Sequence, residues 1–134
     1  MALFVYPFRR EGEWRLPRRL DARPRAPRDE LFGTDGSRAG LWASPILAEL
    51  GLTLLPQLAR ADLLIEGTAL DALEAECRLL MGEARRVGEA TQSRHDHLVR
   101  RLENALEALR LAREAGEAGV FIGDEVGAAA RGPS

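Results

Sequence analysis

Residues 94–115, RHDHLVRRLENALEALRLAREA, carry the strongest periodic pattern in the chain. Apolar residues recur there every three or four positions, as they do on one face of an α-helix. The opposite face alternates arginine and glutamate at spacings that permit salt bridges within a solvated helix surface. The stretch therefore predicts a long helix with one buried side, whose buried positions include Leu98, Leu102, Ala105, Leu109 and Ala112.

A second amphipathic helix is expected just before it, over residues 69–87. Leu73, Cys77 and Leu80 lie on its apolar stripe, so Cys77 is expected to be a buried neutral thiol rather than a nucleophile. Glu74 and Arg78 are four residues apart and should form a surface pair. The pattern breaks at residues 88–92, and so short a link predicts that the two helices form an antiparallel hairpin.

Short runs of branched and aromatic residues predict strands at residues 3–6, 62–66 and 119–123. Residues 52–55 predict either a further strand or more helix, and Ser44-Pro45 followed by Gly51 predicts a short helix between them. A chain that leaves the sheet near residue 65 and returns after two helices runs in the opposite direction. The fold class is therefore α+β: a small antiparallel or mixed sheet of three to four short strands, with the helical hairpin on one face.

The length of 134 residues suits a single domain. We expect this domain to span residues 1–123, with an extended Arg/Pro/Gly-rich excursion at 9–40 and a disordered tail at 124–134. The chain has one cysteine, no signal-peptide pattern and no apolar run of membrane-spanning length. These features predict a cytoplasmic protein that does not contact membranes.

Charge is distributed unevenly along the chain. The net charge is −2, yet residues 9–28 hold eight arginines against three acids. Such a segment can steer the approach of a partner that is acidic at the contact, while aromatic side chains hold the complex. The residues expected to contact the partner are Trp14, Arg15, Arg18, Arg19 and Trp42.

Two other patterns predict no site. The loop GTDGSRAG at residues 33–40 is glycine-rich but has neither phosphate-binding signature, so a phosphate cradle is disfavoured. His95 and His97 are two positions apart on a helix and point to different sides, so no metal site is expected. Asn104 borders the apolar stripe, and a loop-capping or exposed position is favoured over a ligand. Whether Asn104, His95 or His97 has a ligand role stays open.

Without a recognisable catalytic cluster or cofactor motif, the sequence favours a non-enzymatic function. We expect a small bacterial protein-binding module, similar in kind to an immunity protein, an antitoxin or another accessory partner protein. One alternative is a nucleic-acid-binding accessory protein that uses residues 9–28, whose affinity would fall steeply with salt. The other is a small enzyme with no recognisable motif.

Overall fold

The computed structural model describes residues 2–124, and its organising element is the N-terminal strand β1 (Ala2–Glu11). Three strands pair with β1, all antiparallel: β5 (Gly119–Asp124) along one edge, and β2 (Leu16–Arg19) and β3 (Leu31–Thr34) along the other. Strand β4 (Leu63–Ile65) pairs with the outer edge of β5, also antiparallel. The sheet therefore has five strands in the order β2-β1-β5-β4, with β3 beside β1.

The two faces of this sheet differ because successive strand residues point to opposite sides. Leu3 and Val5 of β1 face the main hydrophobic core. Tyr6 and Phe8 face the other way and form a small aromatic cluster with Phe121, whose ring centroid lies 4.9 Å from that of Tyr6. The helices thus cover one face of the sheet, as expected for the α+β class.

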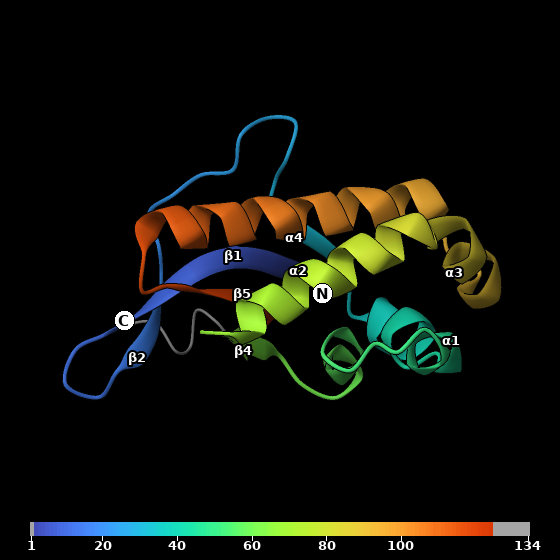
Figure 1. The fold of residues 1–134 in the computed structure, drawn as a ribbon, viewed down its shortest axis with the longest axis horizontal. Coiled ribbons are helices and arrows are strands. Elements are labelled where there is room, and N and C mark those ends of the chain that lie inside the picture. Colours follow the sequence, from blue (N-terminus) through green and yellow to red (C-terminus); the bar gives the residue numbers. More distant parts are fainter. Residues whose placement is uncertain (1, 125–134) are drawn as a thin grey trace.

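The three longer helices are α2 (Ala69–Gly82), α3 (Ala84–Thr91) and α4 (His95–Ala115). Helices α2 and α4 pack side by side along the long axis of the molecule (Figure 1). Leu73 and Leu80 of α2, and Leu102 and Leu109 of α4, are all buried, which confirms the core positions expected from the periodicity. Three one-turn helices lie between β3 and β4: η1 (Arg38–Trp42), α1 (Pro45–Glu49) and η2 (Leu55–Ala59).

The predicted link between the long helices is wrong. The helical pattern breaks at Glu83 rather than at residues 88–92, and α3 continues it before the chain turns at Gln92, which has a left-handed φ of 56°. Gly88 lies inside α3 because the following chain packs against it: a Cβ on Gly88 would lie 2.7 Å from the carbonyl oxygen of Ser93. The glycine therefore marks a close backbone approach rather than a helix end.

The predictions for two loops also need correction. Residues 52–55 form no strand. The Glu76 carboxylate of α2 accepts hydrogen bonds from the backbone N–H groups of Thr53, Leu54 and Leu55, and η2 starts at Leu55. Residues 9–40 are not an excursion away from the sheet throughout, because β2 and β3 within this range pair with β1. The predicted disordered tail at 124–134 lies, apart from Asp124 in β5, outside the described residues.

Candidate functional site

The hairpin between β1 and β2 displays the most exposed large apolar side chain of the described residues. Trp14 is 80% exposed at its tip, and Leu16 beside it is also exposed. The tip is an ordered turn, with Gly12 and Arg15 at φ values of 78° and 52° and the Arg15 N–H donating to the Gly12 carbonyl at 3.1 Å. Trp14 is therefore presented to solvent from a defined backbone position.

Two arginines fix the base of this hairpin. Arg10 donates two hydrogen bonds of 2.8 Å to the Glu66 carboxylate and one of 3.0 Å to the Arg15 carbonyl. On the other face, Arg9 donates to the carbonyls of Ala115 and Gly116 at 2.8 and 2.9 Å. These carbonyls end α4, where a cation also interacts favourably with the helix dipole. The hairpin is thus connected both to the loop after β4 and to the end of α4.

The predicted contact residues separate into exposed and structural positions. Arg15 is exposed and Arg18 half-buried, and neither makes an ion pair with any residue in 2–124. Arg19 pairs with Glu30, and its guanidinium carbon lies 4.4 Å from the ring centroid of Tyr6. Arg19 therefore also holds the chain after β2 against the aromatic face of the sheet.

Trp42 requires a correction. It is only 1% exposed and stacks on Phe32 with ring centroids 5.4 Å apart. A side chain buried in this way packs the core beneath η1 and offers no surface to a docking partner. Of the two tryptophans, only Trp14 remains a candidate contact.

The segment after β2 is tied to α4 by two buried polar side chains. Asn104 accepts a hydrogen bond from the Asp29 N–H at 3.0 Å and donates to the Asp29 carboxylate and the Leu31 carbonyl. Glu107 accepts one from the Arg25 N–H at 2.7 Å. Asn104 thus caps a neighbouring loop, one of the structural options that the sequence left open. The charge pattern of residues 94–115 places Glu107 on the solvated face of the helix, and this prediction is wrong, because the side chain is only 9% exposed.

The electrostatics of Glu107 depend on the next turn of α4. Arg110 donates two hydrogen bonds to its carboxylate, at 2.8 and 2.7 Å. This guanidinium, with a smaller contribution from the Arg25 N–H, outweighs the cost of burial and lowers the pKa of Glu107 to about 2. The side chain therefore stays ionised while only 9% exposed.

The arginine-rich segment does not form one continuous patch. Figure 1 shows the β1–β2 hairpin extending below one end of the molecule, whereas the loop between β2 and β3 rises above α4. Arg23 and Arg25 belong to that loop, and Arg28 there pairs with Glu103. Any single small partner therefore meets the hairpin or the loop over α4.

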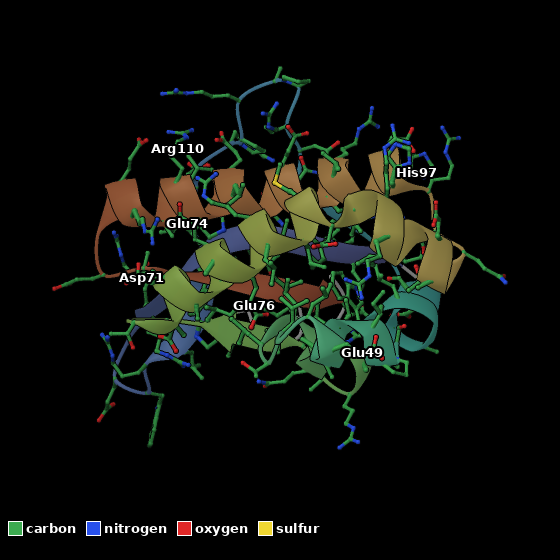
Figure 2. The ribbon with its side chains drawn as sticks, turned by 45° about the vertical axis from the view of Figure 1, so that its right-hand side comes forward. Glu49, Asp71, Glu74, Glu76, His97 and Arg110 are labelled. Carbon is green, nitrogen blue, oxygen red and sulfur yellow. The ribbon has the colours of Figure 1, made fainter. Side chains whose placement is uncertain are left out.

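A basic pocket lies near the start of α4, at the other end of this helix from its contact with Arg9. It has a volume of about 250 Å³ and includes Arg101 and His97 of α4 together with part of the glycine-rich loop. Figure 2 shows His97 near the start of that helix. In the sequence, His97 and the glycine-rich loop at residues 33–40 are separate features, and no sequence pattern indicates that they line one pocket. The pocket is lined by Thr34, Gly36, Ser37, Gly40, Leu41, Thr91, Ser93, Arg94, His97 and Arg101.

The groove between α2 and α4 differs from this pocket because its arginines and carboxylates neutralise one another. Arg113 bridges Asp71 and Glu74 at 2.6 and 2.5 Å, and the expected pair of Glu74 with Arg78 is present at 3.0 Å. Figure 2 shows Glu74 and Asp71 on α2 and Arg110 on α4. This network connects the two helices and leaves these arginines with carboxylate partners.

The described residues were also compared with the requirements of a metal site and of a membrane-spanning helix. Within residues 2–124, no group of three or more His, Cys, Asp or Glu side chains is placed to hold a metal ion. No helix in the same range combines the length and apolar character needed to cross a bilayer. Comparison with protein-family models, curated proteins and solved structures finds no significant match to this chain.

Proposed function

We propose that this protein is a non-enzymatic binding module that docks onto a partner protein through the tip of its β1–β2 hairpin. The observation that carries the proposal is Trp14, 80% exposed on a turn whose base is fixed by Arg9 and Arg10. Tryptophan is enriched among the few residues that dominate binding energy at interfaces. An anchor held in an ordered turn loses less conformational entropy on binding.

The chemistry around Trp14 defines the partner. Leu16 extends the apolar contact, while Arg15 and Arg18 lie nearby without ion-pair partners in the described chain. The matching surface is an apolar pocket for the indole ring, rimmed by carboxylates. A bacterial accessory protein of the immunity or antitoxin kind would use such a contact, and the buried free thiol of Cys77 is consistent with a cytoplasmic location.

The first step of the test isolates the partner. The wild type and a Trp14→Ala variant are immobilised and exposed to extract of the native host, and only the wild type should retain the partner. Binding kinetics with the purified partner follow. Trp14→Ala should raise the dissociation rate by at least about tenfold, because the anchor is lost.

The second step separates steering from anchoring. Replacing Arg15 and Arg18 with alanine should slow association several-fold at low salt, and the effect should fade as salt screens the charges over about 8 Å. Arg100→Ala is the control, because Arg100 is exposed on α4 and makes no ion pair with the described residues. Unchanged partner kinetics with Trp14→Ala would overturn the proposal. Retention of nucleic acid with a steep salt dependence would replace it with the nucleic-acid alternative.

A further inference from the structure

Arg101 is the partly buried arginine of α4 that lacks a partner. Arg110 pairs with Glu107 and Glu114, and Arg113 pairs with Asp71 and Glu74. Arg101 is half-buried, yet within residues 2–124 it has no ion pair and donates no hydrogen bond. Burying a guanidinium without an opposite charge costs free energy. Desolvation lowers the pKa of Arg101 accordingly, and its N–H donors remain available.

The position of this guanidinium is defined by close backbone packing. Gly33, at the end of β3, has a φ of 123°, and a Cβ built on it would lie 3.2 Å from both Cζ and one Nη atom of Arg101. The same Cβ would lie 3.1 Å from the Ser37 hydroxyl. The glycine-rich loop thus passes directly beside the charge. Glycine at this position allows the loop and Arg101 to share one wall of the pocket.

A separate set of contacts holds that loop in place. Arg38, the arginine within the loop, points away from the pocket and donates to the carbonyls of Leu58 and Ala61 at 2.8 and 3.1 Å. It also pairs with Asp62 at 2.6 Å and with Asp35 at 3.4 Å. Arg38 is therefore saturated by the protein. Among the arginines that residues 2–124 place at this loop, Arg101 is the one without a carboxylate partner.

The remaining lining groups favour an anion. No carboxylate lines the pocket in the described part of the chain, while His97 and Arg94 add basic groups. Arg94 is shared, since it pairs with Asp96 at 2.8 Å. Serine and threonine hydroxyls complete the wall. Ser37 and Thr91 donate their hydrogens to the Thr34 and Val87 carbonyls, so the side-chain donors for an anion come mainly from the basic groups.

We propose that this pocket binds the phosphate group of a small phosphate ester. The planar guanidinium of Arg101 has the geometry for two parallel hydrogen bonds to phosphate oxygens. The volume of about 250 Å³ holds a phosphate with a small organic group. The site is independent of the hairpin and does not rest on the protein-binding proposal.

The test uses inorganic phosphate and glycerol phosphate as probes at constant ionic strength, with acetate as the carboxylate comparison. In the wild-type protein, titration followed by NMR should give saturable shifts at the backbone amides of Gly36, Ser37 and Ser93. Calorimetry should show that Arg101→Gln weakens binding at least about tenfold. The matched control Arg100→Gln removes the same charge one residue away on an exposed position and should change affinity less than about twofold.

Any of three other results would overturn the proposal. Absence of saturable shifts up to about 10 mM phosphate would show that no such site exists. Equal weakening by the Arg100 and Arg101 variants would show non-specific attraction of anions. Equal affinity for acetate would show a general anion site rather than a phosphate site. The wild-type NMR titration decides the matter even if Arg101→Gln lowers the melting temperature.

Discussion

At the residue scale, Glu107 stabilises the fold in a pH-dependent way. Its pKa is about 2 in the folded protein against an ordinary value of 4.5. A carboxyl whose pKa is lowered by folding contributes stability above its ordinary pKa, and this contribution is lost as the pH falls towards the folded value. We expect Glu107→Gln to reduce the free energy of unfolding by about 2 kcal/mol at pH 7 and by much less at pH 2 to 3.

Urea unfolding of the wild type and variant at both pH values measures this difference. Glu114→Gln is the matched control, since Glu114 pairs with the same arginine but its side chain is 61% exposed. Its effect should stay below about 1 kcal/mol. An equal loss for Glu107→Gln at neutral and acid pH would show that shape, rather than charge, determines the contribution of Glu107.

Cys77 is the second residue whose environment makes a definite prediction. Burial, together with the neighbouring Glu76 charge, raises its pKa from 9.0 to about 12. At pH 8 its thiolate fraction is then about a thousandfold lower than that of an unperturbed thiol. Labelling of the native protein with a thiol reagent should therefore be slower than labelling in denaturant by at least that factor. Rapid native labelling would contradict the buried position.

Asn104 and Arg101 show which residue properties the sequence could not reveal. The periodicity of α4 places Asn104 beside the apolar stripe, but its partners Asp29 and Leu31 lie more than 70 positions away along the chain. Likewise, whether Arg101 is paired depends on the loop that passes Gly33. Periodicity reports the orientation of a side chain on its own helix. It does not report what the rest of the chain brings to that side chain.

At the scale of the element, α4 is the main support of the sheet. It contacts β1, β3 and β5 as well as α2 and α3. Leu102 is fully buried at its centre. We expect Leu102→Ala to lower the free energy of unfolding by about 2 to 5 kcal/mol, because it removes buried methyl groups and leaves a cavity.

Denaturant unfolding with Leu79→Ala as the control tests this expectation. Leu79 lies on α2 and is 42% exposed, so its truncation should cost less than about 1 kcal/mol. A cost below about 0.5 kcal/mol for Leu102→Ala would mean that the α4 stripe does not form the core.

The elements that were mispredicted share a physical reason. Ala84 and Val87 remain buried after the break at Glu83, so the apolar period continues through the break and conceals it. Strand β2 contains Pro17 in an arginine-rich sequence with no strand pattern, and it forms because β1 offers it a free edge. An edge strand tolerates proline and charge. The long helices and central strands have hydrophobic patterns that predict them from the sequence. An edge strand such as β2 has no such pattern and forms because a neighbouring strand pairs with it.

At the scale of the whole molecule, the two candidate surfaces lie at opposite ends. Figure 1 shows the β1–β2 hairpin at one end and the start of α4, beside α3, at the other. Each surface contains at least one arginine without a carboxylate partner in the described chain, while the groove between α2 and α4 is neutralised by its own acids. The net charge of −2 therefore conceals two separate basic positions.

This separation predicts that the two surfaces bind independently. Trp14→Ala should leave the affinity for inorganic phosphate unchanged, and Arg101→Gln should leave dissociation of the partner protein unchanged. In the double variant each effect should equal that of the corresponding single variant within about 0.5 kcal/mol, because distant sites without shared contacts are additive. Calorimetry with phosphate and dissociation kinetics with the partner measure the two arms. A larger coupling energy would contradict independence. It would mean that α4 transmits binding between the two surfaces, because Arg9 connects the hairpin to the end of α4 and Arg101 lies in the pocket near its start.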